Sequence, residues 1–190
     1  MSTSSSWTDL PGDLPVPEDD GAADHLRGMA VPPIELGATD GRKVRLDIPA
    51  GRTVVYAYPR TGEPGKPSLV EDWDQIPGAR GCTPESCGFR DHHAELQAAG
   101  AGVFGLSTQD TAYQQEAATR LALPFPLLSD ERLELTTALR LPTFAAAGHT
   151  LLKRLTLLLH EGVIERVWYP VFPPDTHAQE VLAWLRDHPA

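Results

Sequence analysis

The hydrophobic pattern divides the chain into short strand candidates and longer helix candidates that alternate. Residues 44–48 alternate apolar and polar side chains, as in a half-buried strand, and residues 54–58 form a continuous apolar run typical of a buried central strand. Further strands are predicted over 103–106, 151–159 and 163–169. An Asp-Gly turn at 40–41 and a Glu-Gly turn at 161–162 indicate hairpins near both ends of this series.

The helix candidates lie between and after these strands. One is predicted over 89–99 and ends at Gly100, which suits a C-terminal cap, while Asp110 is placed to cap the next. The others are predicted over 111–121, 130–139 and 175–187. Strands that alternate with helices, followed by a hairpin and a closing helix, indicate a layered α/β domain.

Two segments lack such a pattern. Residues 1–29 are polar and interrupted by prolines, which predicts a disordered tail and leaves 30–190 as a single domain. Residues 61–81 form a proline- and glycine-rich loop that is longer than most connections, and long ordered loops are often functional. Trp73 and Ile76 are the residues that can anchor this insertion to the domain.

Charge and apolar content restrict the partners and the location. The formal net charge of −10 excludes the positive field that nucleic acids and anionic membranes require. The most apolar stretch, 151–159, is interrupted by charged residues and is too short to span a bilayer. No basic segment followed by an apolar stretch opens the chain, so we expect a cytoplasmic protein without a secretory signal.

The only two cysteines, Cys82 and Cys87, carry the candidate chemistry. This count excludes a scaffold held by several disulfides and favours redox chemistry or a partial metal site. Thr83 can cap a helix, Pro84 suits the first turn, and Glu85 complements the helix dipole. Cys82 would then lie at a helix start, where unpaired N–H groups lower the pKa of a thiol and favour the attacking thiolate.

The spacing of the two cysteines predicts a structural change. On an ideal helix their Cα atoms would lie roughly 8 to 9 Å apart, with side chains pointing about 140° away from each other. A disulfide requires Cα atoms within about 7 Å. If Cys82 and Cys87 bond, the first helical turns must therefore unwind.

Residues 81–91, Gly-Cys-Thr-Pro-Glu-Ser-Cys-Gly-Phe-Arg-Asp, resemble the active-site stretch of the Q-type, or bacterioferritin-comigratory, peroxiredoxins. The resemblance extends from about residue 31 to 183. Residues 56–59 are similar to the strand and proline that precede the peroxide site of the family, and 153–156 to the strand that bears its arginine. Segments 104–110 and 125–130 resemble later landmarks of the family.

This resemblance implies a thioredoxin-like fold, with a central mixed β-sheet flanked by helices and an N-terminal β-hairpin. It further implies a peroxidase without metal or organic cofactor, in which Cys82 attacks the peroxide and Cys87 resolves the sulfenic acid into a disulfide. Pro59 would shelter the thiolate, and Arg154 would hold its charge and polarise the peroxide. Thioredoxin or a similar dithiol would reduce the disulfide, and the protein would be a monomer or a homodimer.

The sequence departs from the family at one position of the site. The family usually has a threonine or serine three residues before the attacking cysteine, where this chain has Ala79. Thr61 is the nearest candidate to supply the hydroxyl, and a backbone group is the alternative. Glu85 has two readings as well, since it either favours the helix start or braces Arg154.

Four other readings of the cysteine pair remain open. The cysteines could be inert, or could bind zinc together with His92 or His93. A reductase of protein disulfides would more typically carry Cys-x-x-Cys, which is absent here. In a non-catalytic redox sensor, the helix unwinding would change a contact with a partner.

Overall fold

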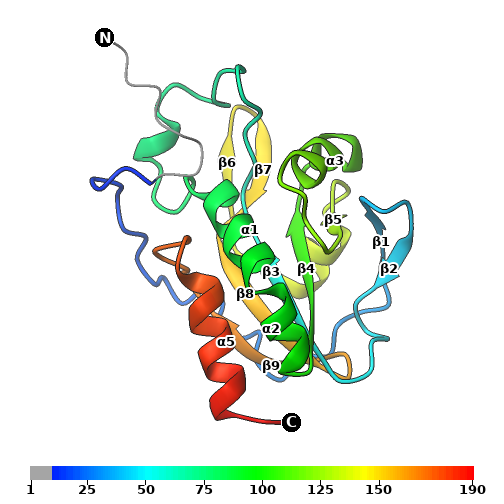
Figure 1. The fold of residues 1–190 in the computed structure, drawn as a ribbon. Coiled ribbons are helices and arrows are strands. Elements are labelled where there is room, and N and C mark those ends of the chain that lie inside the picture. The colour runs from blue at the N-terminus through cyan, green and yellow to red at the C-terminus, as the bar shows by residue number, and fades with distance from the viewer. Residues whose placement is uncertain (1–9) are drawn as a thin grey trace.

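The structure is a computed structural model, and it describes residues 10–190 around a seven-stranded mixed sheet (Figure 1). The strand order is β2-β1-β5-β4-β3-β8-β9. The strands of this sheet are β1 (Glu35–Ala38), β2 (Lys43–Arg45), β3 (Arg52–Ala57), β4 (Ala101–Ser107), β5 (Leu127–Ser129), β8 (Leu155–His160) and β9 (Val163–Trp168). β3, β4 and β5 run parallel, whereas β1 is antiparallel to β5 and β8 is antiparallel to β3. The predicted mixed α/β sheet is therefore confirmed.

Besides the seven-stranded sheet, the described residues form five α-helices, one 3-10 turn and a second, two-stranded sheet. They are η1 (Trp73–Gln75), α1 (Cys82–Asp91), α2 (His93–Ala98), α3 (Thr111–Arg120), α4 (Glu134–Leu139) and α5 (His177–Asp187), with β6 (Thr143–Ala146) paired to β7 (His149–Leu152). The predicted N-terminal hairpin is confirmed, because β1 pairs with β2 around a turn in which Gly41 has a φ of 83°. None of the helices over 10–190 has the length and apolar character that a bilayer crossing would need.

Both faces of the sheet are covered, so every residue of the central strand β3 is buried. α1, α2 and α5 lie in front of the sheet in Figure 1, where Phe89 and Leu96 pack with Val181 of α5. On the other face, Leu135 and Leu139 of α4 belong to a second core cluster. Burial on two sides explains why 54–58 is a continuous apolar run rather than an alternating one.

The predicted disordered tail is wrong for the part of it that the structure describes. Ala23 and Leu26 are buried in the core cluster beside α4. The N–H of Gly28 donates to the carbonyl of Ile164 at 2.8 Å, and Ala30 forms a bridge with Val163 of β9. Two apolar side chains and these backbone bonds suffice to hold a polar segment, so the domain begins well before residue 30. Residues 1–9 of the predicted tail lie outside the described residues.

Several predicted elements have different limits, and the strand over 44–48 is shortened to β2. The strand over 151–159 is two strands, β7 and β8, separated by a bend at Lys153 and Arg154. The helix over 89–99 is divided between α1 and α2 at His92, and the helix over 130–139 begins only at Glu134. Asp130 lies outside the helix, and its carboxylate accepts the N–H groups of Leu135 and Thr136. These first-turn donors have no partner within the helix, so Asp130 caps α4 from a distance.

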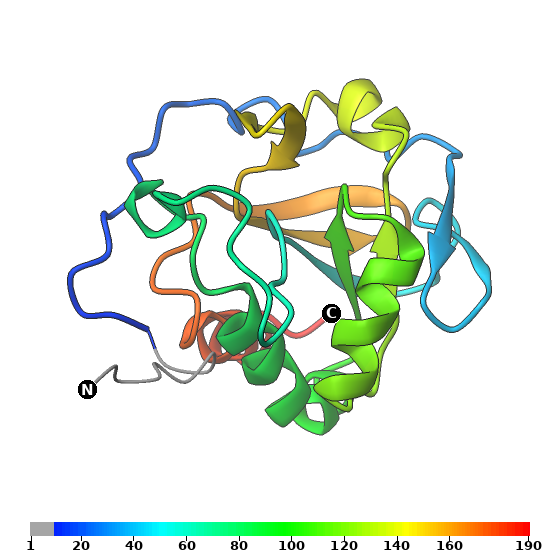
Figure 2. The same cartoon turned by 90° about the horizontal axis from the view of Figure 1, so that it is seen from above.

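The insertion over 61–81 is anchored by the residues that the sequence indicates. Trp73 is 7% exposed and packs with Ala79 and Leu151 in a small third cluster, with Ile76 against its edge. The ring of Trp73 also lies 6.3 Å from that of Phe144 on β6. Figure 2 looks down on this insertion, which lies over the beginning of α1 and beside the β6–β7 hairpin.

Candidate active site

Cys82 is the first residue of α1 and lies at the bottom of a small surface pocket. Its side chain is buried, with 2% of the residue exposed. Gly81 caps the helix with a φ of 108°, and a Cβ at this position would lie 2.4 Å from the ring of Pro174. Only glycine suits both the left-handed backbone and this close approach. The predicted helix start is confirmed, but Gly81 takes the cap position predicted for Thr83.

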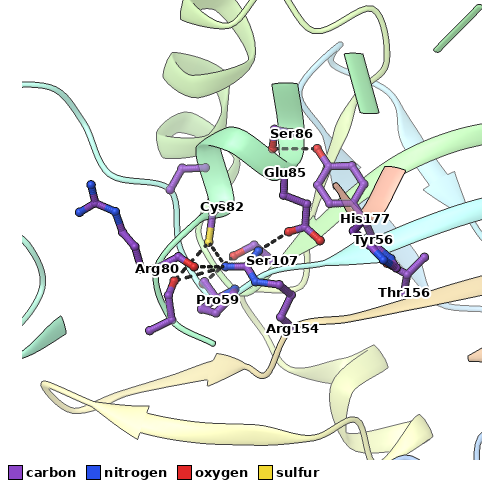
Figure 3. Close-up of polar contacts among 12 residues, drawn as sticks. Tyr56, Pro59, Arg80, Cys82, Glu85, Ser86, Ser107, Arg154, Thr156 and His177 are labelled. Atoms are coloured by element: carbon purple, nitrogen blue, oxygen red, sulfur yellow. Dashed lines mark hydrogen bonds and ion pairs between the residues drawn. The ribbon is translucent and has the colours of Figure 1, made fainter. Parts of the chain in front are cut away.

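Arg154 is 72 residues away in sequence and contacts the sulfur directly. Its Nη2 donates to the Cys82 Sγ at 3.1 Å and to the carbonyls of Ala79 at 3.3 Å and Arg80 at 3.2 Å (Figure 3). Arg154 lies in the bend between β7 and β8, where the chain leaves the regular strand. This bend positions the arginine. The predicted proximity of Arg154 and Cys82 is therefore present in the fold.

Glu85 holds the other side of the arginine. Its carboxylate is fully buried and accepts a hydrogen bond from the Arg154 Nη1. Glu85 lies one helical turn after Cys82, so one face of α1 presents a sulfur and a carboxylate to the same guanidinium. The contact favours the bracing role that the sequence left open, since a buried carboxylate requires a charged partner.

Burial raises the pKa of the Cys82 thiol above its ordinary value. The guanidinium of Arg154 and the backbone N–H of Arg60 lower this pKa, while the carboxylate of Glu85 raises it. The lowered pKa that the helix start predicts is therefore wrong. Burial of the sulfur and the Glu85 carboxylate, which shares the charge of Arg154, outweigh the helix start.

Glu85→Gln should lower the pKa of the Cys82 thiol. The amide removes a negative charge beside the sulfur and still offers an oxygen to the Arg154 Nη1. Thiolate absorbance, followed against pH in a Cys87→Ser background, measures this change for a single thiol. The rate of reaction with hydrogen peroxide should shift to lower pH in parallel, since only the thiolate attacks. Glu95→Gln, a change of an exposed carboxylate on α2, is the matched control; an unmoved midpoint in Glu85→Gln would contradict the electrostatic role.

Pro59 and Thr61 follow β3 and approach the site from the sheet. Both are buried, and Thr61 lines the pocket above Cys82. The Thr61 hydroxyl donates to the side-chain carbonyl of Gln109 at 3.2 Å, and the Ser107 hydroxyl donates to the Pro59 carbonyl at 3.1 Å. The structure thus gives Thr61 a place in the pocket wall, with its hydroxyl engaged by an amide.

Cys87 lies one and a half turns further along α1 and is half-buried. Both cysteines are free thiols within one continuous helix. With α1 intact, a Cys82–Cys87 disulfide cannot form, and its first turns would have to unwind. Burial raises the pKa of Cys87, and the guanidinium of Arg90 acts in the opposite direction.

Sequence reasoning missed the polar groups behind the arginine. His177 is buried, and its Nε2 lies 2.9 Å from the hydroxyl of Thr156, two residues after Arg154 on β8 (Figure 3). The hydroxyl of Tyr56 donates to that of Ser86 at 3.0 Å. No pattern marks these residues, because a histidine at a helix start and a tyrosine in an apolar strand are equally typical of plain core packing.

The zinc reading finds no support in the arrangement of side chains. Over residues 10–190, no three His, Cys, Asp or Glu side chains gather as a metal site would need. The Nδ1 of His92 lies 2.9 Å from a Glu95 carboxylate oxygen, and the ring of His93 lies 5.5 Å from that of Phe125. Both histidines are therefore occupied by other contacts.

Comparisons with known proteins agree with this geometry. A family model described as Redoxin matches residues 26–182. Peroxiredoxin Q, chloroplastic, of Oryza sativa subsp. japonica is 35% identical over 162 residues, which cover 84% of this chain and 66% of the relative. Peroxiredoxin Bcp of Escherichia coli K12 is 31% identical over 166 residues, which cover 85% of this chain and 96% of the relative.

A solved structure gives the same result for the fold. Peroxidoxin BcpB from Mycobacterium tuberculosis is 27% identical and superposes with a TM-score of 0.69, covering 86% of this chain and 98% of that one. The predicted thioredoxin-like fold is thereby confirmed. The chain spans just under two thirds of the length of the rice relative but nearly all of the bacterial one.

Proposed function

The chain belongs to the redoxin family, in its peroxiredoxin Q and Bcp branch, and from this membership we propose that it is a thiol peroxidase. Its substrates are hydrogen peroxide and organic hydroperoxides. The observation that carries the proposal is the 3.1 Å contact between the Arg154 guanidinium and the Cys82 sulfur at the bottom of a pocket. A permanent cation at this position stabilises the thiolate and the charge that develops on the peroxide oxygen.

In the proposed reaction, the Cys82 thiolate attacks one oxygen of the peroxide. A sulfur–oxygen bond forms, the oxygen–oxygen bond breaks, and the leaving oxygen takes up a proton as water or an alcohol. Cys82 is then a sulfenic acid. Arg154 contributes fixed donors that need no reorganisation, and Pro59 shelters the sulfur from water. Thr61 stays a predicted participant, because a peroxide would have to take over the hydrogen bond that Gln109 now accepts.

The second step is condensation of the sulfenic acid with Cys87. A sulfur–sulfur bond forms, water leaves, and the two cysteines become a disulfide. Since both lie in α1, the step requires the first turns of this helix to unwind. Far-ultraviolet circular dichroism of the oxidised protein should therefore show less helix than that of the reduced protein.

We further propose that a dithiol such as thioredoxin reduces this disulfide, in the cytoplasm, and that the protein acts as a monomer or a homodimer. A peroxidase needs an external source of two electrons per turnover, and thiol exchange with an exposed disulfide provides them. Cys87 is already partly exposed in the intact helix, and unwinding of the helix start would expose it further. The acidic net charge of −10 supports neither a nucleic acid nor a membrane as partner.

The direct test is peroxide consumption by the reduced protein. With thioredoxin, its reductase and excess hydrogen peroxide, the wild-type protein should catalyse many turnovers. Because the pKa of Cys82 is raised, the rate of its first oxidation should increase as the pH rises toward that pKa, about tenfold per pH unit. Absence of turnover with any dithiol would refute the proposed activity and leave the redox-sensor reading.

Cys87→Ser should permit one oxidation of Cys82 and then block the intramolecular step. Steady-state turnover with thioredoxin is expected to fall about 10²-fold, because a neighbouring thiol acts at a high effective concentration that a free reductant does not reach. The first oxidation, measured by stopped-flow fluorescence, should keep its rate. Equal turnover of variant and wild type would show that Cys87 does not resolve the sulfenic acid.

A further inference from the structure

The pocket above Cys82 is small, and this size has consequences for the substrate. It has a volume of about 40 Å³. By the same measure a single water needs about 10–15 Å³, so the pocket holds roughly three water-sized groups. Two peroxide oxygens and one short alkyl group match this volume, whereas a phenyl ring on a branched carbon is larger than it.

The insertion over 61–81 supplies one wall of this pocket. Pro67, Leu69 and Trp73 line it from the insertion, facing Tyr113 of α3. On the α3 side, the guanidinium of Arg60 lies over the Tyr113 ring at 4.5 Å. The insertion therefore lines one side of the approach to Cys82 with apolar side chains, which favour contact with a methyl or ethyl group.

The insertion is held in place by its own packing. Trp73 is buried against Ala146 and Leu151, in the cluster that joins the insertion to the β6–β7 hairpin. An Arg80–Asp74 ion pair of 3.3 Å closes the other end of the loop, next to the start of α1. Figures 1 and 2 both show the insertion above this helix start. A packed tryptophan therefore forms part of the wall that a bulky substrate would meet.

We propose that the insertion selects for small peroxides, namely hydrogen peroxide and short-chain alkyl hydroperoxides, and that Leu69 and Trp73 are the specificity-determining residues. The inference rests on the proposed peroxidase function of Cys82 and adds a limit on substrate size. Bulky hydroperoxides such as cumene hydroperoxide react slowly because their alkyl part cannot enter the pocket.

The test compares the rate constants of Cys82 oxidation by hydrogen peroxide, ethyl hydroperoxide and cumene hydroperoxide in stopped-flow experiments. In the wild-type protein the two small peroxides should react at least about tenfold faster than cumene hydroperoxide. Leu69→Ala should raise the ratio of the cumene to the hydrogen peroxide rate constant about tenfold, because it widens the pocket. Trp73→Leu, which keeps an apolar side chain in the cluster, should raise it as well.

Val70→Ala is the matched control, since Val70 packs in the same cluster of the insertion but does not line the pocket. In Val70→Ala, the ratio of the cumene hydroperoxide to the hydrogen peroxide rate constant should equal that of the wild type. Rapid reaction of the wild-type protein with cumene hydroperoxide, or an unchanged ratio in both pocket variants, would overturn the inference and leave the peroxidase function standing. Failure of all three peroxides to oxidise Cys82 would instead overturn the proposed function.

Discussion

Cys82→Ser should lose peroxide reduction almost completely, by about 10³-fold or more in turnover, because the covalent step has no other nucleophile of comparable strength. A serine hydroxyl does not ionise at neutral pH and cannot hold a stable oxidised state in place of the sulfenic acid. Coupled consumption of hydrogen peroxide with thioredoxin measures the loss. Thermal unfolding should change little, since the hydroxyl is smaller than the thiol and can still accept a hydrogen bond from Arg154.

Residual reaction through Cys87 is expected to be slow. Burial raises the pKa of Cys87, and Arg90, which opposes this effect, is itself paired with Asp91. The matched comparison is therefore between Cys82→Ser and Cys87→Ser in a single-turnover experiment. Only Cys87→Ser, which keeps Cys82, should consume one equivalent of peroxide rapidly. Fast consumption by Cys82→Ser would assign the attack to Cys87 and would reverse the proposed roles.

Much of the fold could be predicted because its elements have local signals. Three examples are the Asp-Gly turn at 40–41, the apolar run that forms most of β3, and the Asp110 cap of α3, whose carboxylate accepts the Tyr113 N–H at 2.7 Å. The segments that were misjudged have no such signal. Leu26 and Ala23 are held by residues far away in the chain, so their burial is a tertiary effect.

The site shows the same division between local and distant information. The residues around Cys82 were found from a contiguous motif, and Arg154 from a resemblance rather than from its own surroundings. What the sequence could not show is how the charges combine. The Glu85 carboxylate, the Arg154 guanidinium and the Cys82 sulfur meet only when the bend before β8 lies against the start of α1. Burial of the sulfur, together with these two charges, then sets the pKa of the thiol.

Arg154→Met should lower the rate of Cys82 oxidation by about 10²- to 10³-fold, which is typical of the loss of one preorganised donor to a developing negative charge. Two effects act in the same direction. The pKa of Cys82 rises further when its positive neighbour is removed, which lowers the thiolate fraction. The peroxide also loses the guanidinium that polarises it. Stopped-flow oxidation by hydrogen peroxide across a range of pH separates the two, since a pKa effect alone would be recovered at high pH.

The same substitution leaves Glu85 as an unpaired, fully buried carboxylate, which is expected to cost about 3–5 kcal/mol of unfolding free energy. Arg154→Lys keeps a charge and should be more stable, yet a single ammonium cannot reach sulfur and carboxylate with the geometry of a guanidinium, so its rate should still fall. Arg52→Met is the control for stability, because Arg52 forms a partly buried pair with Glu165 away from the Cys82 pocket. It should destabilise the protein without slowing Cys82 oxidation. If Arg154→Lys and Arg154→Met both react at the wild-type rate, the guanidinium has no part in the chemistry and the 3.1 Å contact is structural only.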